Sequence, residues 1–203
     1  LVQQEFGSEA DGSSVAALNL ALASDGAFVH FARGVALEEP IHVVFVASGD
    51  RAAAFPRNLY VAEAGAQCTI VEHYIGDDGN ASFTNVVSRV RVDPDARLVH
   101  TRLQQEGHDA FHLGRVDVRQ AGKSYFASHS ISLGARLARH DIVTQFGGQR
   151  AETLLNGVYV ANGQRHVELR AVGEEPRGAR LLDELLAQLL DLAVQRVLEL
   201  LEA

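Results

Sequence analysis

Four turn segments recur along the chain at nearly constant intervals, and this regularity limits the folds open to it more than any other feature. The segments are EAGAQ (63–67), DPDAR (93–97), RQAGK (119–123) and FGGQR (146–150), which follow one another every 26 to 30 residues. Each has an alternating apolar strand before and after it. Because the coils of a solenoid stack, their turns must keep one register, whereas the turns of a β-sandwich need not. The spacing therefore favours a parallel β-helix, with a β-sandwich as the alternative.

Short segments of alternating polar and apolar residues occupy the chain from about Val15 to Leu169. They read VAALNLALA, AFVHFA, IHVVFVA, NLYVAE, CTIVEHYI, FTNVVSRVRV, RLVHTRLQQE, LGRVDVRQ, SYFASHSISL, HDIVTQF and LLNGVYVA. A period of two is typical of strands, and turn-forming pairs such as Asp25-Gly26 and Asp78-Gly79 separate the segments. The sequence thus predicts a mainly β domain over residues 1–172, with almost no helix in it.

The period changes after the breaker GEEPRG, and residues 173–203 predict a separate C-terminal helical segment. One stripe of this amphipathic helix, or pair of short helices, is apolar: Leu181, Leu182, Leu185, Leu189, Leu192, Val197, Leu200 and Leu201. Such a stripe needs cover, which the β domain, another copy of the chain or a different protein can supply. The partner-binding candidates are Leu181, Leu185, Leu189, Leu192 and Leu200.

Charge and cysteine content exclude several classes of protein. A net charge of −8 with a pI near 5.5 argues against nucleic acid as a partner, because phosphate binding needs clustered Lys and Arg. A single cysteine excludes an internal disulfide framework and fits a reducing, cytoplasmic compartment. No apolar stretch approaches the roughly 20 residues that span a bilayer, so no membrane association is expected. The lack of any methionine suggests a portion of a longer polypeptide.

The candidates for metal binding are Cys68, His108 and His112. The two histidines stand four apart, which is a metal-pair spacing on a helix but on a strand only places both rings on one face. No cysteine or group of carboxylates nearby completes such a site. Cys68 occupies a strand position where a small buried apolar residue is the commoner role, and no partner base is recognisable. We therefore expect no metal site and no nucleophile.

The remaining ionisable residues do not form a recognisable active site either. Histidines at 73, 100, 129 and 140 lie on or beside expected strands, where a hydrogen-bonded or solvent-facing imidazole is commoner than a catalyst. Paired carboxylates would indicate sugar chemistry on a β-helix, but Glu72, Asp117 and Asp141 have no spacing that singles them out. From the residues alone, no catalytic group is predicted.

Five segments in order resemble the SufB/SufD family of iron-sulfur cluster assembly scaffolds, and its SufD branch in particular. They are ARGVALEEPIHVVFVASG, FPRNLYVAEAGAQCTIVEHYIG, FTNVVSRVRVDPDARLVHTRLQQEG, FHLGRVDVRQAGKSYFASHSISLGARLARHDI and AETLLNGVYVANGQRHVE. The resemblance runs from about Val15 to Glu168. It implies a right-handed parallel β-helix in a cytoplasmic complex, where SufD pairs with SufB and each carries one SufC ATPase on a C-terminal helical region.

The resemblance also indicates where this sequence departs from the family. There, a segment like NGQRHV is followed by further β-coils that include a CSHG-like motif, and nothing similar occurs here. We therefore expect that the later coils are missing, and we transfer no assembly residue of the family to this chain.

The expected function is that of a non-catalytic scaffold. It would pair with a SufB-like subunit and dock a SufC-like ATPase through the C-terminal helix, with no permanent cofactor and a transient iron-sulfur cluster in the complex. One alternative is a carbohydrate-active β-helix enzyme, which would need a cleft lined by Asp, Arg and aromatic residues. Another is a purely structural homo-oligomeric solenoid, for example a homodimer, that associates through its uncapped strand edges.

Overall fold

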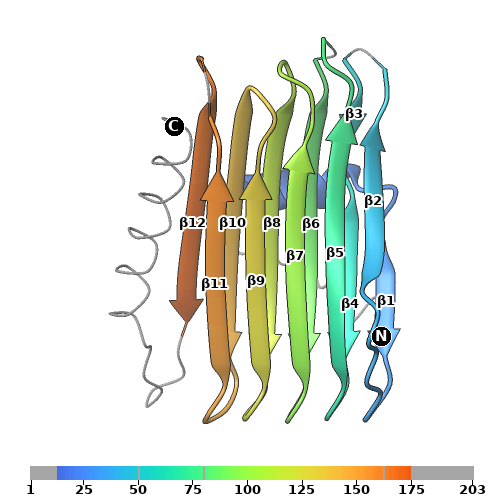
Figure 1. Cartoon of the computed structure of the whole chain (residues 1–203), viewed down its shortest axis with the longest axis vertical. Coiled ribbons are helices and arrows are strands. Elements are labelled where there is room, and N and C mark those ends of the chain that lie inside the picture. The colour runs from blue at the N-terminus through green and yellow to red at the C-terminus, as the bar shows by residue number, and fades with distance from the viewer. Residues whose placement is uncertain (1–12, 50, 80, 162, 175–203) are drawn as a thin grey trace, which may run out of the picture.

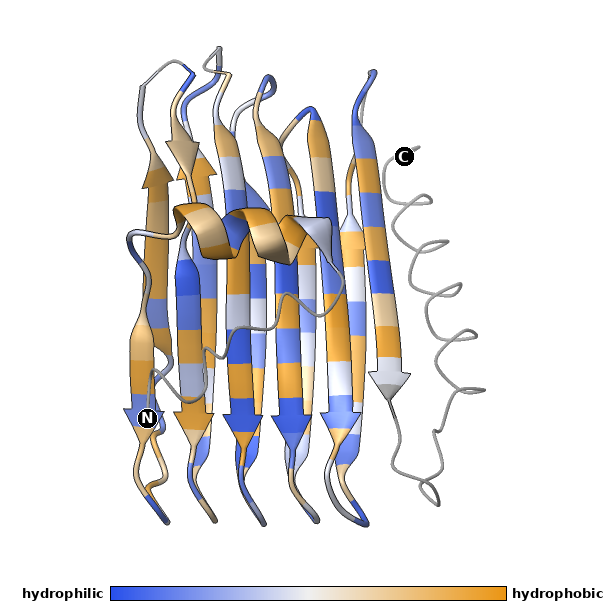
Figure 2. Ribbon diagram, turned by 180° about the vertical axis from the view of Figure 1, so that it is seen from behind, coloured by the Kyte–Doolittle hydropathy of each residue, from blue (hydrophilic) through white to orange (hydrophobic). Residues whose placement is uncertain are grey.

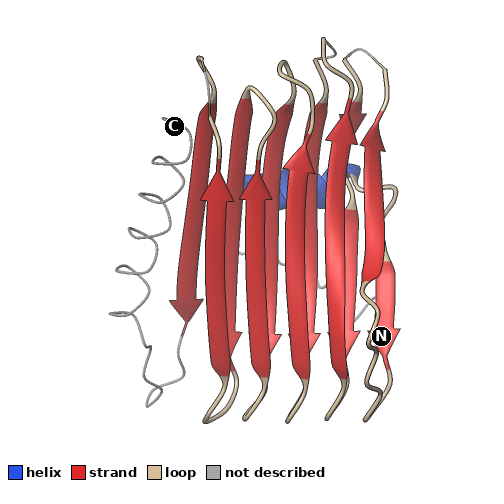
Figure 3. Cartoon of the chain, in the orientation of Figure 1, coloured by secondary structure: helices blue, strands red, loops and turns tan. Residues whose placement is uncertain are grey.

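Strands make up most of the part of the chain that the structure describes (Figure 3). The structure is a computed structural model that describes residues 13–174 except 50, 80 and 162. Its elements are α2 (Ser14–Leu22), β1 (Phe28–Phe31), β2 (Ile41–Ala47), β3 (Ala53–Ala54), β4 (Arg57–Ala62), β5 (Gln67–Gly76), β6 (Phe83–Val92), β7 (Arg97–Gln105), β8 (Phe111–Gln120), β9 (Tyr125–Ser132), β10 (Leu137–Phe146), β11 (Glu152–Tyr159) and β12 (His166–Glu174).

The strands form two parallel sheets that face each other across the interior (Figure 1). The front sheet has the order β2-β5-β7-β9-β11, and the back sheet has the order β1-β4-β6-β8-β10-β12, with β3 beside β6. From β4 onward the chain alternates between the sheets, so that each strand pairs with the strand two places later in the sequence. One front strand and one back strand together form each coil.

Successive coils stack in register. In the front sheet Gln67 pairs with Arg97, Arg97 with Tyr125 and Tyr125 with Glu152, in steps of 30, 28 and 27 residues. The chain runs up the front sheet, down the back sheet and advances from β2 toward β11, which makes the coil right-handed (Figure 1). The parallel β-helix is therefore confirmed. The β-sandwich alternative is wrong, because its strands would pair antiparallel.

The recurring turn segments all connect the back sheet to the front sheet. They place one residue with positive φ at the same point of each turn: Gly65 at 72°, Asp95 at 59°, Lys123 at 59° and Arg150 at 60°. Backbone hydrogen bonds join neighbouring turns, such as the 3.0 Å bond from the Gly65 N–H to the carbonyl of Pro94. A stacked backbone thus imposes the left-handed conformation, even where the residue is not glycine.

The segment VAALNLALA forms a helix, so the strand predicted there is wrong. Helix α2 begins after Ser13, whose Oγ accepts a hydrogen bond from the N–H of Ala16 at 3.3 Å. Alanine and leucine have high helix propensity, and Val15 is the one β-branched residue in the helix. Alternation of small apolar residues does not distinguish a strand from a helix at this length.

Helix α2 lies across the outer face of the back sheet (Figure 2). It is anchored by Asn19, which is fully buried and donates from Nδ2 to the carbonyls of Pro56 at 3.0 Å and Asn85 at 2.8 Å. Arg57 in turn donates to Asn19 Oδ1 at 2.9 Å. Polar bonds as well as apolar contact therefore hold the helix on the sheet.

Strand β12 runs through Glu174, two residues beyond the boundary predicted between the β domain and the C-terminal segment. The leucine stripe predicted over residues 179–203 lies outside the described residues. In the part of the chain that is described, no helix has the length and apolar character needed to cross a bilayer.

Candidate functional site

The interior of the β-helix has an apolar half and a polar half. The apolar half adjoins the recurring turns and includes Cys68, Ile70, Leu98, Val116, Val118 and Phe126. The polar half lies toward the opposite ends of the same strands and includes Glu72, His100, Arg102, Gln104, His112, Ser128, Ser130 and His140, all nearly or fully inaccessible to solvent. Charged side chains are rarely buried without partners, so the polar half is the candidate site of this molecule.

Glu72 is the centre of one cluster. Four side chains donate hydrogen bonds to its carboxylate, and they are Ser88 at 2.6 Å, Tyr60 at 2.7 Å, Asn58 at 2.9 Å and Tyr74 at 3.0 Å. The fifth contact is His100, whose Nε2 lies 3.3 Å from Oε2. Burial alone would raise the pKa of Glu72, but His100 and the hydrogen bonds from Ser88 and Tyr60 outweigh it and hold the pKa at about 2. Glu72 is therefore ionised at neutral pH.

Glu106 forms a second cluster one coil further along. Its Oε2 lies 2.7 Å from His112 Nδ1 and accepts a hydrogen bond from Gln104 Nε2 at 3.0 Å, while Thr84 donates to Oε1. Burial opposes ionisation here too, but His112 and these hydrogen bonds hold the pKa of Glu106 at about 2. The two clusters place two carboxylates inside the solenoid.

Arg102 supplies positive charge close to both carboxylates. Its side chain is 1% exposed and donates from Nη1 to Ser132 Oγ at 3.1 Å and to Ser130 Oγ at 3.2 Å. Burial lowers the pKa of Arg102, whereas Tyr74, Glu106 and Glu72 raise it. A guanidinium keeps its proton under such conditions, so Arg102 offsets part of the buried negative charge.

His112 and His140 approach each other where β8 has a glycine. A Cβ atom on Gly114 would lie 3.0 Å from His140 Nδ1 and 3.2 Å from His112 Nε2, so a larger residue there would have to displace these rings by a few tenths of an ångström. Burial lowers the pKa of His112, against the opposing effect of Glu106. Burial, Arg102 and the neighbouring histidines hold the pKa of His140 well below its ordinary value, so this imidazole is neutral.

Replacing His140 with leucine is expected to make the protein less sensitive to acid. Neither nitrogen of this ring hydrogen-bonds to a described residue, and its lowered pKa means that only the unfolded chain takes up the proton below pH 6.5. The wild type therefore loses about 1.4 kcal/mol per pH unit below 6.5 from this group. The free energy of unfolding of His140→Leu should therefore fall by about 2 kcal/mol less than that of the wild type between pH 7.5 and pH 5.

Urea unfolding at both pH values measures this effect. His129→Leu is the matched control, since His129 lies on the outer face of the front sheet and bonds Asn156 there at 3.1 Å. If the free energy of unfolding falls equally for the wild type and His140→Leu between pH 7.5 and pH 5, His140 does not contribute to acid sensitivity.

Cys68, His108 and His112 are not brought together. Cys68 lies in the apolar half, where burial raises the pKa of its thiol to about 12. His108 is exposed in a turn, 3.6 Å from Asp78, whereas His112 points inward four residues later. The two rings do not share a face because a turn separates them. Among the described residues, no three His, Cys, Asp or Glu side chains are arranged to hold a metal ion.

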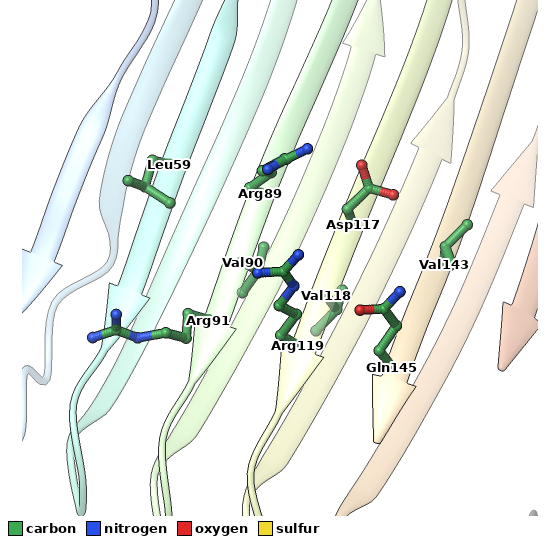
Figure 4. Close-up of a pocket in the computed structure, with 9 residues that line it drawn as sticks. All are labelled: Leu59, Arg89, Val90, Arg91, Asp117, Val118, Arg119, Val143 and Gln145. Carbon is green, nitrogen blue, oxygen red and sulfur yellow. The ribbon is translucent and has the colours of Figure 1, made fainter. Parts of the chain in front are cut away.

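The carboxylates Asp117 and Asp141 lie on the outer face of the back sheet in ion pairs. Arg115 contacts Asp117 at 2.7 Å, and Arg139 contacts Asp141 at 3.0 Å. A small depression beside Asp117 encloses about 20 Å³, which holds about one water molecule. Its lining is Leu59, Arg89, Val90, Arg91, Asp117, Val118, Arg119, Val143 and Gln145 (Figure 4). A larger hollow of about 380 Å³ on the same face is lined by Arg115, Arg139 and Asp141 among others. Each lining has one carboxylate and no aromatic ring, unlike the cleft that a carbohydrate-active enzyme needs.

The polar interior joins consecutive coils. Contacts of Glu72 reach β4, β5, β6 and β7, and Arg102 extends the connection from β7 to β9. These roles could not be predicted from residues taken one at a time. The signal was present in the alternation of β5, where Glu72 shares its side of the strand with the apolar Ile70 and Tyr74.

Stacked coils with polar side chains linking them inside define a parallel β-helix. Residues 45–174 match the family model described as SUF system FeS cluster assembly, SufBD core domain. The chain therefore belongs to the SufB/SufD family, as its resemblance to that family predicted.

Several curated relatives are similar to the chain. An iron-sulfur cluster assembly SufBD family protein of Synechocystis is 32% identical over 148 residues, covering 68% of this chain and 33% of the relative. Protein ABCI7, chloroplastic, of Arabidopsis thaliana is 29% identical, with 77% and 35% covered. SufD of Escherichia coli is 28% identical, with 64% and 28% covered. The matched region thus amounts to about a third of the length of these relatives.

Proposed function

We propose that the chain is a non-catalytic scaffold subunit in iron-sulfur cluster assembly of the Suf type. The observation that carries this proposal is the family match over residues 45–174, in which every strand from β4 to β12 takes part. The burial of the ionisable cluster supports it, because Glu72, Arg102 and His112 are at most 1% exposed and cannot reach a substrate from these positions. Iron and sulfur would be cargo of the complex, held as a transient cluster.

The proposal includes two partners. A SufB-like subunit would pair with the β-helix, and a SufC-like ATPase would dock on the C-terminal segment over residues 173–203. The leucine stripe of that segment supports the second partner, since such a stripe needs an apolar surface to cover it. Leu181, Leu185, Leu189, Leu192 and Leu200 are the residues that we assign to this contact.

The mechanical role follows from how the coils are joined. Parallel hydrogen-bond ladders run across both sheets, and the Glu72 and Arg102 contacts cross-link four consecutive coils from within. A body of this kind moves as a unit when its end is displaced. ATP-driven movement of a bound ATPase would then be transmitted through the solenoid to a subunit paired with it.

Co-purification with a SufC ATPase tests the proposal. The full chain should retain the ATPase and a version ending at Gly173 should lose it, because the truncated chain has no leucine stripe. A Gln188→Asp variant is the control, since it alters the polar side of the segment and should bind like the wild type. Native mass of each sample gives the stoichiometry. Failure of the full chain to retain the ATPase, or equal retention by both versions, would contradict the proposed docking site.

A further inference from the structure

The last coil, made by β11 and β12, ends the described solenoid with an apolar surface. Its exposed apolar residues are Val158, Tyr159, Val160, Leu169 and Val172. Val158 and Val172 lie on the outer faces of the sheets, in register with Ile131 and Val143. Tyr159 is 55% exposed although it pairs in register with Ser132, which points inward and is buried. Leu169 likewise pairs with the buried His140. Tyr159 and Leu169 are therefore interior side chains that nothing in the described part of the chain covers.

Interior positions change from polar to apolar at this coil. In the polar half of the interior, the inward residues of β9 are Ser128, Ser130 and Ser132, and their partners on β11 are Leu155, Gly157 and Tyr159. Leu169 extends from the back sheet to Gly157, where an added Cβ would lie 2.2 Å from Leu169 Cδ2. An end of the solenoid that faced water would be expected to carry polar side chains. Apolar side chains at this end therefore indicate that another apolar surface covers it.

The chain that follows β12 has the right position to supply that cover. Back-sheet strands connect to the front sheet through four- or five-residue turns, such as 93–96 and 147–151. The breaker at 175–178 has the length of one such turn, which is enough chain to pass from β12 to the front sheet beside β11.

The length and pattern of the following residues fit the coil as well. Residues 179–203 would span about 37 Å as a helix, against about 30 Å for the nine residues of β12. One helix can therefore cover the coil lengthwise. Its leucine stripe matches the apolar surface below it, and a helix laid there would also cover the unpaired edges of β11 and β12.

We propose that the leucine stripe of residues 179–203 packs in cis on the last coil, and that docking of the ATPase displaces it. The second half rests on the proposed function, since the same leucines are assigned to the ATPase contact. The last coil and the ATPase compete for the same leucine stripe. The stripe therefore covers the last coil in the free chain and leaves it exposed in the ATPase-bound chain. Such an exchange would couple ATPase docking to exposure of the solenoid end.

A fluorescent reporter on the last coil tests the cap. The chain contains no tryptophan, so Tyr159→Trp introduces a single emitter at the exposed interior position. In the full chain its emission should be blue-shifted, and acrylamide quenching should be several-fold weaker than after Leu185→Asp and Leu189→Asp are added. Gln188→Asp, on the polar side of the segment, should leave both quantities unchanged. Circular dichroism verifies that each variant keeps its β signal.

Equal quenching in the presence and absence of the leucine substitutions would overturn the cap. Quenching that depends on protein concentration and not on the leucine substitutions would also overturn it, because a second copy would then be the cover.

Adding the ATPase to the Tyr159→Trp chain tests the competition. Emission should shift toward that of the Leu185→Asp and Leu189→Asp variant as the stripe leaves the coil. Binding without this shift would overturn the competition and leave the proposed docking intact. Absence of binding would overturn both the proposed docking and the competition, whereas the cap is judged separately by the comparison without ATPase.

Discussion

Replacing Glu72 with alanine is expected to lower the free energy of unfolding by about 3–5 kcal/mol at pH 7, the usual cost of removing one partner from a buried ionic cluster. The carboxylate accepts four hydrogen bonds and lies 3.3 Å from His100, so its loss leaves several buried donors without an acceptor. Those donors belong to two consecutive coils. The substitution therefore weakens the connection between coils as well as the local cluster.

Urea unfolding followed by circular dichroism measures this loss. Glu152→Ala, at the exposed start of β11, is the control and should change stability by less than about 0.5 kcal/mol. The pKa of Glu72 is held at about 2, below its ordinary value of 4.5, so its stabilisation is present above pH 4.5 and is lost as the pH falls toward 2. The difference between wild type and Glu72→Ala should shrink over that range. A loss below about 1 kcal/mol at pH 7 would show that the cluster does not stabilise the fold.

The architecture could be predicted because its signal is repeated. Each of the segments 63–67, 93–97, 119–123 and 146–150 is a weak turn signal alone, but a common spacing is difficult to produce unless the coils stack. The structure places a left-handed residue at the same point in all four. Errors in individual segments therefore did not affect the fold class.

Helix α2 could not be predicted by the same reasoning, because it occurs once and lies outside the coil. VAALNLALA has apolar residues on every side, so its period does not separate helix from strand. Its position is decided by long-range bonds from Asn19 to Pro56 and Asn85. Bonds between residues so far apart in the sequence leave no local pattern.

The polar interior was missed for a different reason. Glu72, His100 and Arg102 have unremarkable spacings along the chain, and they meet because consecutive coils place residues about 30 apart side by side. A turn separates His108 from His112, so these two residues do not meet although they stand only four apart in the sequence. In a solenoid, distance between coils determines which side chains meet more than distance in sequence does.

Phe126→Ala should lower the free energy of unfolding strongly and Ser128→Ala should hardly change it, although both side chains point inward from β9. Phe126 is fully buried in the apolar half, where it pairs in register with Leu98, and Phe126→Ala should cost about 3–5 kcal/mol through lost burial and a cavity. Ser128 is also fully buried, but its Oγ has no hydrogen bond to a described residue. Ser128→Ala should therefore be neutral within about 0.5 kcal/mol or slightly stabilising.

The comparison separates two ways in which the interior can stabilise the solenoid. In the first, the apolar half provides the burial energy and specific clusters such as that of Glu72 join the coils. Polar groups without a hydrogen bond to a described residue, such as Ser128, then contribute little, and only Phe126→Ala lowers the urea midpoint. If the polar half is instead one continuous network, Ser128→Ala should cost more than about 1 kcal/mol, because removing one member leaves others unsatisfied. That outcome would contradict the hypothesis that only specific clusters such as that of Glu72 join the coils. The expected result makes the apolar half the energetic core of the scaffold, with Glu72 and Arg102 as its cross-links.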